Sequence, residues 1–251
     1  MFFRFFSLIL LLSGCSLSSP KPQQLFTAET PTHSRFAIPS AKERMIDLAK
    51  QEWRLFGRAT VNYAADYPRL SYAEHAFHSH EQLPSFFSRV LMYWYTATEL
   101  PIIGLDGEIS PWSGAFIVWL VRSAGVPQSE FPSSVLHWDY IEFLLANDSK
   151  SRFIIHPTNE YAPKPGDIIC APRDPVFIKT INSITDLKRG PYHCDLVVEQ
   201  RQGELDVIGG NVLDAVSLTH IQIDESGHLI ANQHRPWILV IEQRDSPATL
   251  K

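Results

Sequence analysis

The feature that most constrains the fold is a change of hydrophobic period partway along the chain. Up to about residue 145 the apolar residues recur at helical spacing, and from about residue 165 they read as strands. Helices therefore come first and strands later, without regular alternation. This order predicts an α+β domain in which N-terminal helices pack on an antiparallel β-sheet.

Three of the four expected helices are recognised mainly by the spacing of their apolar residues. The first covers residues 40–56, where the apolar side chains share one helical face and Gly57 follows as a stop. The second covers residues 83–98 and is rich in aromatic residues, and the fourth is a short helix over 134–145. The aromatic side chains of the second helix are expected to be core.

The third helix has the clearest boundary signals. Ser110 can cap it, and Pro111 suits the first helical position. The apolar run 112–124 forms its body, and Gly125 follows as a C-terminal stop. We therefore expect a helix that begins at Pro111 and has Ser113 near its N-terminus.

The strands are expected after Pro165-Gly166-Asp167, which opens the first of them. Further strands are predicted over residues 194–199, 205–208 and 237–242. Asp167 is expected to have a structural role at the start of its strand.

The N-terminus has the pattern of a secretory signal. Residues 1–14 contain one positive charge and a short apolar run that is too short for a permanent membrane span. The segment Leu12-Ser13-Gly14-Cys15 resembles a lipobox, which implies that Cys15 is diacylated and becomes the mature N-terminus. Two or more acyl chains hold a protein stably on a membrane. By the sorting rule of Gram-negative lipoproteins, Ser16 in place of aspartate implies the outer membrane, facing the periplasm.

The domain division follows from composition. Residues 15–40 combine the lipidated cysteine with a polar, proline-containing stretch that has no hydrophobic period, so we interpret them as a flexible tether. Residues 41–251 are within the range of one domain. A net charge of -5 with no long basic run argues against nucleic acid as a partner.

Two cysteines remain after Cys15. Cys170 and Cys194 both lie in expected strands, and leftover thiols are often paired in an oxidising periplasm. If the two strands are neighbours, a disulfide is feasible. Two buried unpaired thiols are the alternative, since a disulfide demands a specific separation.

Four segments, in order, resemble the CHAP and NlpC-type amidohydrolase and peptidase families. Residues 111–119 (PWSGAFIVW) look like their nucleophile helix, 165–169 (PGDII) like a strand opening, and 192–199 (YHCDLVVE) like their histidine strand. Residues 208–212 (IGGNV) resemble the strand end that supplies a third polar residue. The resemblance implies a papain-like fold. The chain is also similar to an uncharacterised family of bacterial lipoproteins that keeps serine at the nucleophile position.

The resemblance implies a role for each site residue. Ser113 would be the nucleophile, at a helix N-terminus where free N–H groups favour negative charge. His193 would be the general base, and Asn211 would orient its ring. Strand alternation puts His193 and Asp195 on one face of the strand and Cys194 on the other, so Asp195 is the alternative orienting residue.

Each of these residues has a second interpretation. Serine replaces the cysteine of the related families, and its hydroxyl depends on general-base help, so Ser113 is either a working nucleophile or a small residue in an idle cleft. His193 can be a core histidine, and Asn211 can be a turn residue after two glycines. His137 either lines the cleft or packs.

His75, His78 and His80 form the one histidine cluster that could suggest a metal site. Their spacing matches no closed four-ligand pattern, and clustered histidines in a polar stretch are usually a solvated loop. We therefore expect no metal or other cofactor.

These observations lead to one expected function and a rival. The first is a lipid-anchored envelope protein that hydrolyses peptide or amide bonds of peptidoglycan with a Ser-His site. The rival is a catalytically inactive papain-like lipoprotein that binds cell-wall material or a protein partner in the same cleft.

Overall fold

The structure is a computed structural model, and it describes residues 39–63, 68–72, 84–101, 109–146, 151–232 and 235–244. The expected signal segment, Cys15 and nearly all of the tether lie outside the described residues, as do His75, His78 and His80. The residues from Pro39 onward belong to one compact unit.

The four helices predicted from the sequence are confirmed, and a short fifth helix and a 3-10 turn are added. Their bounds are α1 (Ala41–Leu55), α2 (Pro84–Thr98), α3 (Ser113–Ser123), α4 (His137–Leu145), α5 (Pro175–Ile178) and the 3-10 turn Ile184–Asp186. The first helix begins at a capping box between Ser40 and Glu43 and is followed by Gly57 at a φ of 76°. No helix among the described residues has both the length and the apolar character needed to cross a membrane.

The expected cap of the third helix is wrong. Helix α3 begins at Ser113, and its N-cap is Trp112, which makes no side-chain capping hydrogen bond. Trp112 is fully buried beside Phe56, Tyr93 and Phe116. Burial of this large ring therefore sets the start of the helix, in place of the capping hydroxyl that the sequence suggested at Ser110.

The strands form a single eight-stranded sheet with the order β2-β1-β7-β6-β5-β4-β8-β3. Their bounds are β1 (Ala59–Asn62), β2 (Arg69–Ser71), β3 (Phe153–Pro157), β4 (Ile168–Pro172), β5 (Tyr192–Arg201), β6 (Glu204–Val212), β7 (Ala215–Gln222) and β8 (Leu239–Gln243). The fold is thus α+β, as predicted, but the sheet is not wholly antiparallel. Strand β1, which the sequence did not reveal, runs parallel to β7, and all other neighbours are antiparallel.

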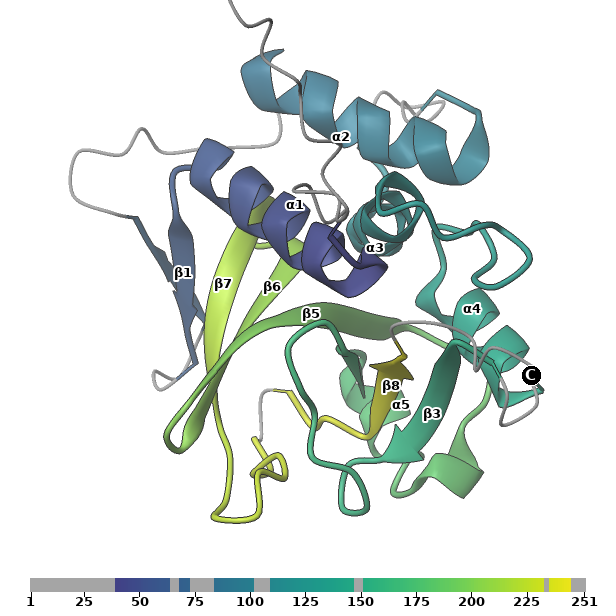
Figure 1. The fold of residues 1–251 in the computed structure, drawn as a ribbon, viewed down its shortest axis with the longest axis vertical. Helices are drawn as coiled ribbons and strands as arrows, with labels where there is room; N and C mark the ends of the chain where they lie inside the picture. The colour runs from purple at the N-terminus through teal and green to yellow at the C-terminus, as the bar shows by residue number, and fades with distance from the viewer. Residues whose placement is uncertain are drawn as a thin grey trace, which may run out of the picture. The chain divides into compact units, whose positions relative to one another are not determined.

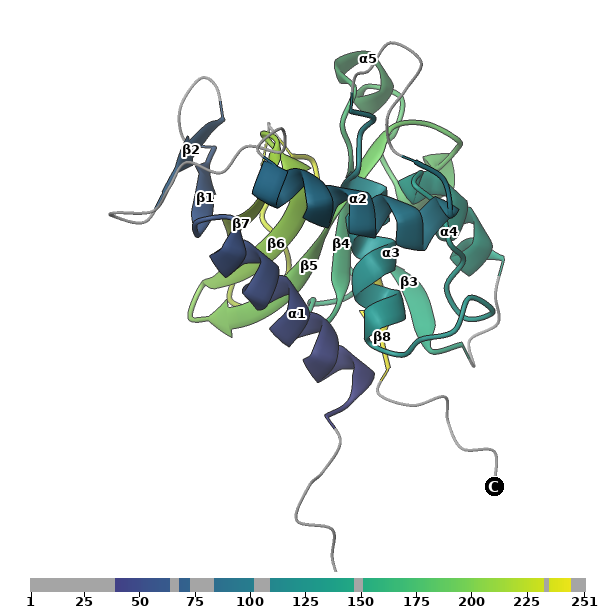
Figure 2. The same ribbon diagram turned by 90° about the horizontal axis from the view of Figure 1, so that it is seen from above.

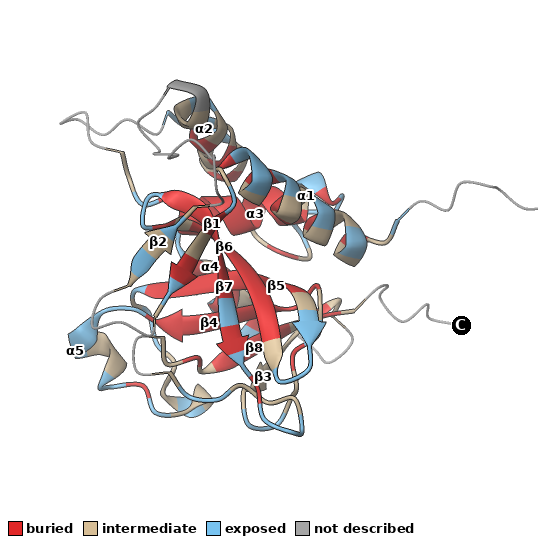
Figure 3. Cartoon of the chain, turned by 90° about the vertical axis from the view of Figure 1, so that its left-hand side faces the viewer, coloured by how far each residue is buried: buried red, intermediate tan, exposed pale blue. Residues whose placement is uncertain are grey.

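Helices α1 and α3 cover one face of the central strands, and α2 lies on α3 as an outer layer (Figures 1 and 2). Every residue of α3 from Ser113 to Val121 is buried, and the central strands are buried over most of their length (Figure 3). The nucleophile candidate at the start of α3 is therefore held by the core of the domain. Alternate residues of the strands, such as Val197 and Val207, form a second, smaller apolar cluster with Trp237.

A buried charge ties α1 to α2. Glu52 is fully buried and accepts hydrogen bonds from the guanidinium of Arg89 and the hydroxyl of Tyr93. Burial and the neighbouring carboxylate raise the pKa of Tyr93 well above its ordinary value, so the phenol stays protonated and donates.

Asp167 has the structural role that the sequence suggested. Its buried carboxylate accepts hydrogen bonds from the backbone N–H groups of Lys164 at 2.8 Å and Gln243 at 3.0 Å, and from the Tyr161 hydroxyl at 3.1 Å. These bonds fasten the start of β4 to the end of β8.

Candidate active site

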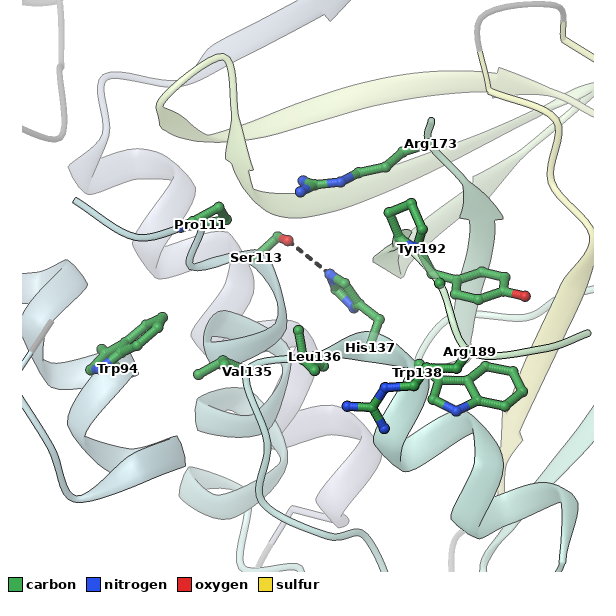
Figure 4. A pocket seen from close by; sticks show the side chains of 12 residues that line it. Trp94, Pro111, Ser113, Val135, Leu136, His137, Trp138, Arg173, Arg189 and Tyr192 are labelled. Carbon is green, nitrogen blue, oxygen red and sulfur yellow. Dashed lines mark hydrogen bonds between the residues drawn. The ribbon is translucent and has the colours of Figure 1, made fainter. Parts of the chain in front are cut away.

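The Ser113 hydroxyl lies 2.8 Å from Nε2 of His137, the first residue of α4 (Figure 4). A glycine makes this approach possible. A Cβ atom on Gly114 would lie 2.2 Å from the carbonyl oxygen of Val135, so the segment before α4 packs directly on the first turn of α3. The two helix starts are thereby held together, and both side chains are buried.

The other nitrogen of His137, Nδ1, is hydrogen-bonded to the hydroxyl of Tyr140, one turn further along α4. Burial, the neighbouring His193 and the arginines Arg173 and Arg235 lower the pKa of His137 well below its ordinary value, so its imidazole is neutral. Burial raises the pKa of Tyr140, so its phenol keeps its proton.

The neutral imidazole of His137 and the protonated phenol of Tyr140 fix the direction of the two hydrogen bonds that His137 makes. The Tyr140 hydroxyl makes no other hydrogen bond within the described residues, and a buried hydroxyl proton needs an acceptor. Tyr140 therefore donates to Nδ1, which leaves the ring proton on Nε2. His137 is then a hydrogen-bond donor to the Ser113 oxygen.

A second imidazole lies beside the first. The rings of His137 and His193 have their centroids 5.6 Å apart, and His193 Nε2 is 2.7 Å from Oδ1 of Asp195, two residues along β5. Burial lowers the pKa of His193. Burial alone would raise the pKa of Asp195, but His193 and Arg235 bring it below its ordinary value.

The result is a neutral imidazole bonded to a carboxylate. A carboxylate only accepts hydrogen bonds, so His193 donates through Nε2 and its Nδ1 carries a lone pair. The site thus contains one imidazole poised to donate, His137, and one poised to accept a proton, His193.

Two glycines of β6 make room for Asp195 and for helix α3. A Cβ on Gly209 would lie 1.8 Å from Oδ1 of Asp195, and a Cβ on Gly210 would lie 2.5 Å from Cβ of Phe116 in α3. The bare backbone therefore lets the carboxylate of Asp195 and helix α3 approach the same strand. The β6–β7 ladder shifts register here, between Gly209 and Val212.

The contacts differ in part from those expected. Within the described residues, the hydrogen bond of the Ser113 hydroxyl goes to His137 and not to His193. Of the two proposed orienting residues, Asp195 holds the His193 ring. Asn211 makes no such bond in the described part of the chain and occupies the left-handed region at φ 56°, as a turn residue does.

Sequence reasoning missed the direct contact of His137 with Ser113. It placed His137 in the cleft or the core, and the structure places it in both, because the side chain is buried and lines the cavity. The contact depends on how α4 packs on α3, and no pattern of spacing along the chain contains that information.

Cys170 and Cys194 form a disulfide and face each other in register on the neighbouring strands β4 and β5, with their Cα atoms 4.1 Å apart. Strand alternation turns Cys194 to the opposite face from His193 and Asp195. The disulfide therefore joins the histidine strand to β4 within the main core cluster, on the face of the sheet that packs against the helices.

A cavity of about 400 Å³ opens beside Ser113 (Figure 4). Its apolar wall includes Trp94, Val135, Trp138 and Tyr192, and Arg173 and Arg189 supply its charge. This volume falls in the range of small-molecule and peptide sites.

One group of potential metal ligands occurs within the described residues, away from this cavity. Ligand atoms of Glu204, Asp206 and His220 all lie within 4.8 Å of one another. Arg201 makes ion pairs with both carboxylates, and His220 lies 2.7 Å from Asp206. An ion-pair network on the strand surface accounts for this cluster without a metal.

A family model described as an uncharacterized protein conserved in bacteria (DUF2272) matches residues 84–243. The matched part contains Ser113, His137, Tyr140, His193 and Asp195. No curated protein and no solved structure gives a match to this chain.

Proposed function

The chain belongs to this bacterial family of uncharacterized proteins, and we propose that its domain is a peptide or amide hydrolase with Ser113 as the nucleophile. The observation that carries the proposal is the placement of the Ser113 hydroxyl. It lies at the N-terminus of a buried helix, 2.8 Å from one imidazole, and Ser113 lines a cavity of about 400 Å³.

In the proposed reaction His193 is the general base. Asp195 keeps the ring proton on Nε2, so Nδ1 accepts the Ser113 proton as the serine oxygen attacks the substrate carbonyl carbon. The Ser113 hydroxyl turns from His137 toward His193 for this step, and catalytic hydrogen bonds often tighten only when substrate binds. His193 then returns the proton to the leaving amine, and a water molecule hydrolyses the ester on Ser113 by the same route.

Two features would stabilise the negative charge on the carbonyl oxygen. The first turn of α3 offers backbone N–H groups and the positive end of the helix dipole. The Nε2–H group of His137, held in that tautomer by Tyr140, is a second donor within reach of the Ser113 oxygen. His137 is thus an electrophilic partner and Asp195 a positioning residue.

The setting and substrate are also proposals. A nucleophile at a helix start, with a histidine on a sheet strand that packs against that helix, supports the papain-like relation suggested by the sequence resemblance. The Cys170–Cys194 disulfide supports export to an oxidising compartment. Together with the lipobox-like segment at Cys15, these features support a lipoprotein of the cell envelope, on the periplasmic side of the outer membrane, that acts on peptidoglycan peptides.

The test uses the full chain, extracted from the bacterial envelope in detergent. Incubation with purified peptidoglycan should release new amino termini, and mass spectrometry of the products identifies the cleaved bond. The Ser113→Ala and His193→Gln variants should lose about a thousandfold or more of the rate. Unchanged rates in both variants would refute the proposed nucleophile and base.

A second candidate function is supported by one observation. The hydrogen bond from His137 engages the Ser113 oxygen without removing its proton, which is the arrangement expected of a binding site with no activated nucleophile. A fluorophosphonate probe separates the two functions. Covalent labelling of Ser113 that depends on His193 supports the hydrolase, and absence of labelling together with peptidoglycan binding supports the inactive binding protein.

A further inference from the structure

The lining of the cavity beside Ser113 carries positive charge. Among its lining residues are two arginines, Arg173 after β4 and Arg189 before β5, and none of the described lining residues is acidic. The whole chain, in contrast, carries a net charge of -5. A cationic cavity in an acidic protein is a specific feature of this site.

Arg173 is the better placed of the two. Its side chain reaches toward the Ser113–His137 hydrogen bond (Figure 4) and, within the described residues, makes no side-chain hydrogen bond or ion pair. Arg189 lies 3.5 Å from Asp139, but its side chain is 69% exposed, so this ion pair is weak and exchangeable.

A third arginine adds positive charge behind the site. Arg235 lies over the ring of Tyr63, and its Nη1 atom is buried with no hydrogen-bond partner among the described residues. Burial lowers the pKa of both His137 and His193, and the charges of Arg235 and Arg173 lower them further. The carboxylate of Asp195, which interacts electrostatically with Arg235, is already bonded to His193.

We propose that this cavity binds the free C-terminal carboxylate of a peptide substrate through Arg173, with Arg189 as a second contact, so that the site prefers peptides with a free carboxylate to their amides. The guanidinium group donates two parallel hydrogen bonds to a carboxylate, and such charge-assisted bonds are strong in a partly buried cavity. The apolar wall formed by Trp94, Val135 and Trp138 accommodates the body of the peptide beside that carboxylate.

This inference deepens the proposed function, and it is tested by binding so that the two fail separately. The full chain carrying Ser113→Ala is titrated calorimetrically with acetyl-alanyl-alanine, which has a free carboxylate, and with its C-terminal amide. The carboxylate form should bind about tenfold more tightly. Arg173→Met should remove this preference, Arg173→Lys should restore part of it, and Arg54→Met, an exposed arginine on α1, should leave it unchanged.

Equal binding of the acid and the amide, or no binding of either, overturns the proposal. Inorganic phosphate that competes as well as the dipeptide acid also overturns it, because the cavity would then be a general anion site. If the acid is preferred in an Arg173-dependent way but the wild-type chain hydrolyses no peptide, the binding assignment stands and the hydrolase proposal falls.

Discussion

Replacing Gly209 by alanine should break the Asp195–His193 hydrogen bond while leaving both of these residues in the sequence. The new Cβ would lie 1.8 Å from Oδ1 of Asp195, the same oxygen that is 2.7 Å from His193 Nε2. The carboxylate must therefore move by more than about 1 Å, beyond hydrogen-bond range of the ring. A lost charge-assisted bond and crowding in a packed core each cost about 1–3 kcal/mol.

We expect the free energy of unfolding to fall by about 3 kcal/mol in the Gly209→Ala variant. The same substitution in an Asp195→Ala background should cost about 1 kcal/mol, because the carboxylate is absent and the remaining close atom is Cγ2 of Val212 at 3.1 Å. Urea titration followed by tryptophan fluorescence gives the four values of this double-mutant cycle, with an expected coupling of about 2 kcal/mol. If the two costs are equal, the clash with Asp195 is not the cause and the reasoning is refuted.

Three further predictions concern the same site. Tyr140→Phe should destabilise the fold by about 1–2 kcal/mol in urea titrations and lower the hydrolysis rate, because His137 loses the partner that fixes its tautomer; an unchanged rate would contradict that role. Burial lowers the pKa of His137 in the folded state, so below about pH 6.5 the unfolded chain binds more protons than the folded chain. The free energy of unfolding should therefore fall as the pH is lowered, by up to about 1.4 kcal/mol per pH unit from this group. A His137→Gln variant should show a shallower fall between pH 7 and 5, and an identical slope would count against a neutral buried His137. Removing the disulfide by Cys170→Ala with Cys194→Ala should cost about 3 kcal/mol for a sequence separation of 24, and dithiothreitol should have a similar effect on the wild type and none on the double variant.

Local signals predicted much of the fold. The helix start at Ser40 and the stop at Gly57 are both present, because these signals act within one turn of chain. Strand alternation correctly paired His193 with Asp195 on one face. Strands β1, β2, β3 and β7 were not predicted. Strand β1 has four residues, too few for a clear period, and its parallel pairing with β7 depends on contacts distant in sequence.

The site was predicted less completely, for a similar reason. Motif order identified Ser113 and His193, but the partner of the Ser113 hydroxyl is decided by how closely α4 approaches α3. That approach depends on Gly114 meeting the Val135 carbonyl oxygen, a contact between segments about twenty residues apart. The glycine itself is visible in the sequence, whereas its neighbour in space is not.

The Glu52 contact has a consequence for where this domain can be cut. The family match begins at residue 84, yet the carboxylate that holds Arg89 and Tyr93 comes from α1, and the open side of β7 is closed by β1. A fragment that starts at Pro84 would leave an unpaired guanidinium group and a bare strand edge open to pairing with another chain. The smallest soluble fragment therefore has to begin ahead of Ser40, so that the first helix retains its cap.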